Sequence, residues 1–161
     1  MVTAQPHFEK EKKLKLGARI RKIRMFRNIT QKELGRRLGY GESSADGRIA
    51  QYESGQRTPK QETLIRIAEI LEVDVRNFLS PGIATMDELM ETLFWMDEEN
   101  RGLFHLFLLN DSESEIVGIT MRDKKTMSYL QEWMGKKQKL GDGRITEEEY
   151  LEWKLHWPEN K

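Results

Sequence analysis

Two residues whose side chains suit the recognition of nucleic-acid bases lie three positions apart in the first half of the chain. Arg48 and Gln51 belong to the stretch RIAQYESG, in which Ile49 and Tyr52 have the spacing of an inward helical face. On such a helix Arg48 and Gln51 point outward. Arginine can bond to both O6 and N7 of guanine, and glutamine to both N6 and N7 of adenine. Side chains of these types can therefore form hydrogen bonds with base edges in the major groove of DNA.

The surrounding elements must hold this short helix in place, and the sequence predicts five helices for that purpose. Thr30 and Glu33 have the spacing of a capping box, and Gly39 can end the same helix in a left-handed conformation. The helices are predicted to begin near Leu14, at Thr30, near residues 44–46, at Thr58-Pro59 and after Asp74.

The stretch ITQKELGRRLG…RIAQYESGQRTP, over about residues 16–79, resembles the XRE, or phage-repressor, family of helix-turn-helix regulators. The matching positions are Thr30-Gln31, Glu33-Leu34, Leu38-Gly39, Ile49, Glu53, Gly55, Pro59 and the LIRIAEILEV helix. The resemblance implies a five-helix repressor-like DNA-binding domain whose third helix enters the major groove.

The resemblance also implies roles for individual residues. Base edges would be contacted by Arg48, Gln51, Asp46 and Gly47. The DNA backbone would be contacted, without reading of sequence, by Gln31, Arg57 and Lys60. Arg24 and Glu53 would form a structural ion pair that does not face DNA.

The sequence departs from the family in the turn before the third helix. Nine residues, 40–48, separate Gly39 from Ile49. About five do so in the family pattern, whose turn is about 3–4 residues long. Either the helix starts a turn early or the turn bulges, and we expect a bulge with the helix beginning near residues 44–46. Glu42 and Asp46 would then repel phosphates unless they meet cytosine amines or hold a neighbouring arginine.

The two halves of the chain carry opposite charge. Residues 1–80 hold 17 Lys and Arg against 10 Asp and Glu, and residues 81–161 hold 10 against 17. The change falls at Ser80-Pro81-Gly82, a sequence that stops helices. We therefore expect a charged tail over residues 1–13, a DNA-binding domain over 14–80, and an acidic C-terminal domain over 83–161.

The second half predicts a small α+β domain made of a helix, a β-hairpin and two helices, so that the whole chain is mainly α. A buried helix is the alternative for the first strand, GLFHLFLLN. The apolar stripes expected to lie inside are Leu89, Leu93 and Met96, and Met127, Leu130 and Met134. The four tryptophans are expected in the core, with a subunit or partner interface as the alternative. The segment KLGDGRITEEEYLEWK resembles a short bacterial oligomerisation element.

Several classes of protein are excluded or disfavoured. The chain has no cysteine, which excludes disulfides and thiolate metal sites and is compatible with a reducing cytoplasm. Gly141-Asp142-Gly143 resembles part of a calcium-binding loop, but Gln138 and Leu140 stand where carboxylates are needed. No catalytic constellation, cofactor motif, secretory signal or membrane-spanning run is apparent.

The resemblance thus implies a cytoplasmic, bacterial or phage-type regulator of transcription that binds double-stranded DNA. A repressor acting as a homodimer on a palindromic operator is the expected form, although activation stays open. The acidic half would dimerise or receive a protein or small-molecule effector. The alternative is an antitoxin-like or other protein-binding module whose acidic half binds a partner protein.

Overall fold

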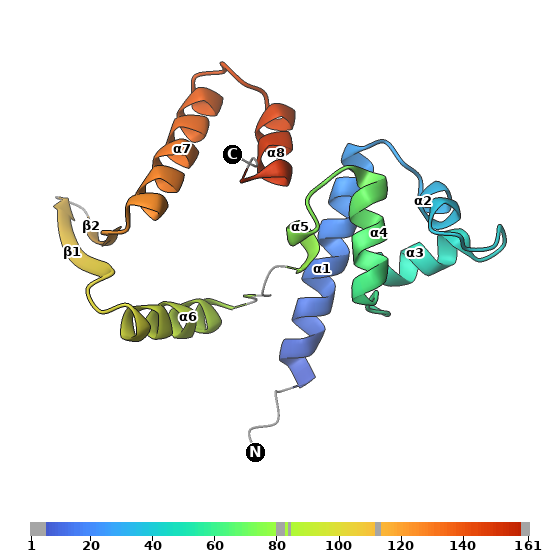
Figure 1. The fold of residues 1–161 in the computed structure, drawn as a ribbon, viewed down its shortest axis with the longest axis horizontal. Helices are drawn as coiled ribbons and strands as arrows, with labels where there is room; N and C mark the ends of the chain where they lie inside the picture. The colour runs from blue at the N-terminus through green and yellow to red at the C-terminus, as the bar shows by residue number, and fades with distance from the viewer. Residues whose placement is uncertain (1–5, 80–82, 84, 112–113, 159–161) are drawn as a thin grey trace. The chain divides into compact units, whose positions relative to one another are not determined.

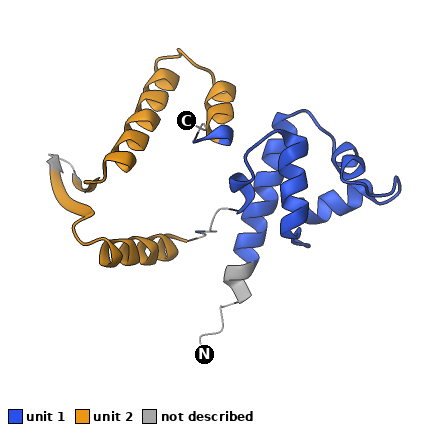
Figure 2. Cartoon of the chain, in the orientation of Figure 1, with its two compact units in different colours: residues 1–84, 155–161 blue, residues 85–154 orange. Residues whose placement is uncertain are grey.

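The computed structural model describes residues 6–79, 83, 85–111 and 114–158, and most of them are helical. The elements follow in the order α1 to α6, β1, β2, α7 and α8 (Figure 1). They form two compact units, one of residues 1–84 with 155–161 and one of residues 85–154 (Figure 2). The predicted fold class, mainly α with a small α+β region after the five helices, is confirmed. The expected boundary at 80–82 lies outside the described residues.

Helix α1, Pro6–Phe26, begins well before the predicted start at Leu14. Residues 6–13 of the expected charged tail are therefore helical. Proline is tolerated at the first position of a helix, and the Lys- and Glu-rich run that follows has a high helix propensity. The apolar period marks only where α1 meets the core, because Ile20 and Ile23 are fully buried whereas Leu14 is exposed.

The four helices that follow confirm the predicted count, and their starts differ by a few residues at most. They are α2 (Gln31–Arg37), α3 (Ala45–Glu53), α4 (Gln61–Leu71) and α5 (Arg76–Leu79). The hydroxyl of Thr30 accepts the N–H of Glu33 at 3.1 Å, as predicted, while the Glu33 carboxylate pairs with Arg37. Helix α4 begins after the predicted Thr58-Pro59, because the backbone of Lys60 is still extended.

The core of the first unit draws on α1, α2, α3 and α4. Its fully buried large side chains are Ile20, Ile23, Leu34, Ile49, Ile67 and Leu71. The end of α8 belongs to the same unit: the carbonyl of Leu155 accepts the N–H of Asp74 at 3.2 Å and the side chain of Asn77 at 2.7 Å. Because residues 155–161 group with the first unit, the second compact unit is shorter than the expected domain 83–161.

Two glycines let the helices of the first unit approach α3 closely. A Cβ atom on Gly17 of α1 would overlap the carbonyls of Tyr52 and Glu53 at the end of α3, and one on Gly35 of α2 would overlap Ala45 at its start. In both places the obstacle is backbone, which cannot move aside as a flexible side chain can. Helix α3 is therefore held at both ends by contacts that only glycine permits.

The second unit contains α6 (Met86–Glu99), β1 (Phe104–Asp111), β2 (Ser114–Met121), α7 (Lys124–Gly141) and most of α8 (Glu147–His156). The strands pair antiparallel, with Leu106 opposite Ile119 and Leu108 opposite Val117. Each of the three helices starts at a predicted cap: Thr85, Asp123 and Thr146 accept backbone N–H groups three residues on. The predicted order of elements is confirmed, and the helical alternative for the first strand is wrong.

The predicted inner faces of α6 and α7 are not buried. Neither helix contains a buried residue, and Trp95 and Trp133 are exposed, although these tryptophans were expected in a core. The periodicity correctly places the apolar residues on stripes. It cannot say whether a stripe is covered by the same chain or by another molecule.

Candidate nucleic-acid interface

Helix α3 presents the predicted base-reading residues on its outer side. Its inner side is formed by Ala45, Ile49 and Tyr52, all of which are buried. The outer side carries Arg48, which is half-buried, and the exposed residues Gln51, Asp46 and Gly47. The structure thus brings all four residues to the part of α3 that the core leaves uncovered.

Arg48 lies against an aromatic ring that sequence reasoning did not single out. Its guanidinium carbon is 5.0 Å from the ring centre of Tyr40, which is a cation–π contact. The hydroxyl of Tyr40 is in turn 3.0 Å from the hydroxyl of Tyr52 on the inner side of α3. Burial, followed by this hydrogen bond, raises the pKa of Tyr40, so the phenol stays neutral at physiological pH. Tyr40 therefore connects Arg48 to the core.

The extra residues before α3 lengthen the turn and do not add a full turn to the helix. Helix α2 ends at Arg37 and α3 starts at Ala45, with Gly39 in the left-handed region at φ 87°. The backbone N–H of Ser44 donates to the carbonyl of Gly41 at 2.9 Å, and its hydroxyl donates to the same oxygen at 3.2 Å. The expected bulge, with the helix beginning near residues 44–46, is confirmed.

The acidic residues in this enlarged turn and in the first turn of α3 have partners within the protein. The carboxylate of Glu42 lies 2.6 Å from Lys32 and 3.2 Å from Arg36, both on α2. The hydrogen bond from Lys32 lowers the pKa of Glu42, which is ionised at neutral pH. Asp46 accepts the N–H of Gly47 at 2.8 Å in the first turn of α3, where the helix dipole favours a negative charge. Glu42 thus offsets the positive charge of α2 beside α3.

A buried ion pair fixes the C-terminal end of α3. Arg24 donates to both carboxylate oxygens of Glu53, at 2.6 and 3.0 Å, and to the carbonyl of Ile29 at 2.7 Å. Both charged residues are only 8% exposed. The side-chain amide of Gln31 donates to the same carboxylate at 2.8 Å. Gln31, a predicted backbone contact, is therefore also part of the network that joins α1, α2 and α3.

The other predicted backbone contacts are exposed and follow α3. The backbone N–H of Arg57 donates to the carbonyl of Gln51 at 3.0 Å, so the segment folds back along the end of the helix. Lys60 is the residue before α4, and Gln31 is the first residue of α2. The first amides of a helix have no partner within it and favour phosphate groups, which suits both positions to DNA backbone contact.

A comparison with known proteins identifies the type of domain. The family model described as a helix-turn-helix domain matches residues 17–80, which run from α1 through α5. No curated protein matches the chain. Helix α2, the enlarged turn and α3 form the helix-turn-helix itself. Residues 17–80 therefore match a helix-turn-helix domain, a kind of domain that suggests a DNA-binding regulator.

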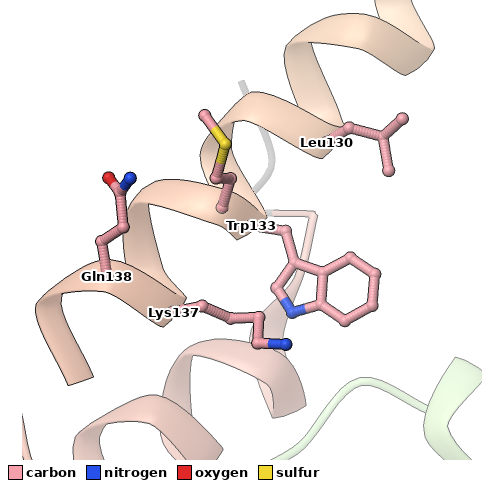
Figure 3. Close-up of a pocket in the computed structure, with 5 residues that line it drawn as sticks. Leu130, Trp133, Lys137 and Gln138 are labelled. Atoms are coloured by element: carbon pink, nitrogen blue, oxygen red, sulfur yellow. The ribbon is translucent and has the colours of Figure 1, made fainter. Parts of the chain in front are cut away.

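The described residues also have properties that bear on metal sites, membrane helices and pockets. Within the described residues, no group of three or more His, Cys, Asp or Glu side chains could hold a metal ion. None of the described helices is long and apolar enough to cross a membrane. An open hollow of about 430 Å³ lies along α7 and is lined by Leu130, Trp133, Met134, Lys137 and Gln138 (Figure 3). It belongs to the second unit and contains none of the predicted site residues.

Proposed function

We propose that this protein is a sequence-specific regulator of transcription that binds double-stranded DNA. Helix α3 would lie in the major groove, with Arg48 and Gln51 on base edges and Asp46 and Gly47 beside them. Gln31, Arg57 and Lys60 would contact the phosphate backbone and set the register. The observation that carries this proposal is that α3 is fixed at both ends while its polar outer side stays open.

The regulator would act as a repressor, as a homodimer on a palindromic operator. One reading helix contacts only a few base pairs, so two copies on half-sites about one helical turn apart are needed for useful specificity. Bound there, the dimer would block access of the polymerase to the promoter.

Selection of bound sequences from a random DNA pool tests this function directly. We expect a palindromic motif. Arg48→Ala and Gln51→Ala should each abolish preference at one base position per half-site, at a cost of about 1–3 kcal/mol in discrimination. Arg57→Ala is the matched control, because loss of a phosphate contact weakens binding to all sequences and reduces the salt dependence.

Two results would contradict the proposal. One is a pool from which the parent protein enriches no sequence. The other is a set of variants in which the Arg48 and Gln51 changes have the same effect on random and on selected DNA as the Arg57 change. In the second case the protein binds DNA, but α3 does not read it.

A further inference from the structure

The second unit has the elements of a folded domain, but among its described residues only Tyr150, on α8, is buried. Neither α6 nor α7 contains a buried residue. The exposed fractions are 74% for Met86 and 62% for Phe94 on α6, and 46% for Trp133 and 56% for Met134 on α7. Exposed apolar surface on this scale marks an interaction site in a native protein.

The hairpin is apolar on both faces. Residues of one strand alternate between faces, so Leu106, Leu108, Val117 and Ile119 share one face, and Phe107, Leu109 and Ile116 share the other. All seven side chains are exposed. A two-stranded sheet of this kind is marginal by itself, and sheets with two apolar faces are normally covered on both. The unit therefore needs a partner to bury this surface.

The charges of the two helices favour a partner of the same sequence. Helix α6 carries six acidic residues and no basic one, and α7 carries five lysines and a single glutamate. Each helix is thus complementary to the other in charge, and each has an exposed apolar stripe. A second copy of the chain supplies both complements at once, since α6 can meet α7 of the partner while α7 meets α6 of the partner.

The position of the charges also indicates the direction of pairing. Asp97, Glu98 and Glu99 lie in the last turn of α6, and Lys124 and Lys125 in the first turn of α7. Both placements oppose the helix dipole, which favours cations at the C-terminus and anions at the N-terminus. Placing the acidic end of α6 beside the basic start of α7 offsets both unfavourable interactions with the helix dipoles. This arrangement requires the two helices to be antiparallel.

We infer that the second unit is a homodimerisation surface in which α6 of one copy packs antiparallel against α7 of the other. Met86, Met90 and Phe94 form a stripe about 12 Å long, and Met127, Leu130 and Met134 one of about 10 Å, at 1.5 Å per residue. In the antiparallel arrangement Met86 lies beside Met134 of the partner and Phe94 beside Met127. The hollow formed by Leu130, Trp133 and Met134 then receives the start of the partner's α6 (Figure 3).

The absence of cysteine allows this arrangement to be tested by disulfide trapping in the full chain. Met86→Cys chains are mixed with isotope-labelled Met134→Cys chains, oxidised, and weighed intact so that mixed and identical pairs are distinguished by mass. Mixing Met86→Cys with labelled Met127→Cys is the matched control for parallel packing. We expect the mixed 86–134 product to exceed the mixed 86–127 product at least about tenfold, because neighbouring thiols have a high effective concentration.

Light scattering of the parent chain provides a second measurement that does not depend on any variant. The inference requires a dimer without DNA. A parent chain that is monomeric overturns the inference. This includes a monomer whose apolar surface is buried only by a different protein. A dominant 86–127 product also overturns it. So does a chain with both Met86→Cys and Met134→Cys that closes its disulfide within one molecule.

This inference deepens the dimeric part of the proposed function, and the two can fail separately. A dimer with the expected disulfide that enriches no DNA sequence would contradict the DNA-binding role alone. A protein that enriches a motif but is monomeric in solution would contradict the dimer surface alone.

Discussion

At the scale of single residues, Arg48 is proposed to contact a base and is oriented by Tyr40, which is not. The Arg48 side chain has several rotatable bonds. Its contact with the ring of Tyr40 limits the conformations that this side chain adopts. Tyr40 is in turn oriented by Tyr52, which belongs to the core. Restricting Arg48 before DNA binds lowers the entropy lost on binding. Tyr40 is thus a positioning residue for the proposed contact.

Replacement of Tyr40 should therefore change base preference at a single position. Tyr40→Leu removes the ring and should reduce discrimination at the base read by Arg48 by about 1 kcal/mol, the usual value of a cation–π contact. Tyr40→Phe keeps the ring and should retain the preference. Competition binding between the selected operator and its single-base variants measures both. In an Arg48→Ala background, Tyr40→Leu should have no effect on that position, and an equal effect there would show that the two residues act separately.

Asp74 provides a prediction about pH. Hydrogen bonds from the side chain and the backbone of Arg76 lower the pKa of Asp74 to about 2. A carboxyl group whose pKa is lower in the folded state stabilises the fold above its unfolded pKa, and this contribution is lost as the pH falls through the folded pKa. Asp74→Asn should therefore be less stable than the parent at pH 7, and the difference should shrink between about pH 4 and pH 2. Urea unfolding across this range measures it, and a difference that stays constant would contradict the assignment.

At the scale of elements, backbone contacts decide where α3 lies. Gly35 brings α2 against the start of α3, and Gly17 brings α1 against its end. The buried pair of Arg24 and Glu53 then ties the end of α3 to α1. Close approach of helices and a buried ion pair together leave α3 little freedom to shift, which favours rigid presentation of its outer side.

Two glycine substitutions should have opposite effects on stability. Gly35→Ala places a methyl group against the Ala45 backbone and should lower the free energy of unfolding by about 1–3 kcal/mol. Gly47→Ala is the matched control, since it lies within α3 with open space around it and should raise that free energy by about 0.5–1 kcal/mol. Denaturant unfolding monitored by circular dichroism compares them. Equal effects would mean that α2 and α3 are not in close contact.

The elements could be predicted from sequence where the signal is local. Thr30, Thr85, Asp123 and Thr146 all cap helices, because a cap depends only on a side chain and an amide a few residues away. The outward position of Gln51 likewise followed from the spacing of Ile49 and Tyr52. Gly17, Gly35 and Tyr40 were missed, because their contacts join segments that are distant in sequence or are set by the conformation of a turn.

At the scale of the whole molecule, the two units have separate tasks in the proposed regulator. The first presents α3 and carries the basic half of the sequence, and the second exposes the surface assigned to a second copy. The α7 stripe of Met127, Leu130 and Met134 was predicted as an inner face, because burial by the same chain and by another chain require the same periodicity. The structure leaves this stripe exposed. On α6 the predicted stripe, Leu89, Leu93 and Met96, differs from the more exposed one, Met86, Met90 and Phe94.

Spacing of the two half-sites should matter more than the sequence between them. Insertion of about 5 base pairs at the centre of the selected operator turns one half-site by half a helical turn, so a dimer cannot engage both. Affinity should then fall to that of a single half-site, measured by fluorescence anisotropy. Replacement of central base pairs without a change in length is the control and should have a smaller effect. Equal affinity for the parent and lengthened operators would contradict two-fold binding.

The glycine contacts that hold α3 do not involve the outer side chains proposed to contact DNA. They involve Ala45, Tyr52 and Glu53, and the side chains on the outer edge take no part in them. In the proposed regulator, substitutions of the outer side chains would therefore change the target sequence while these glycine contacts stay intact. Duplicated copies would be expected to diverge fastest at that edge and slowest at Gly17 and Gly35.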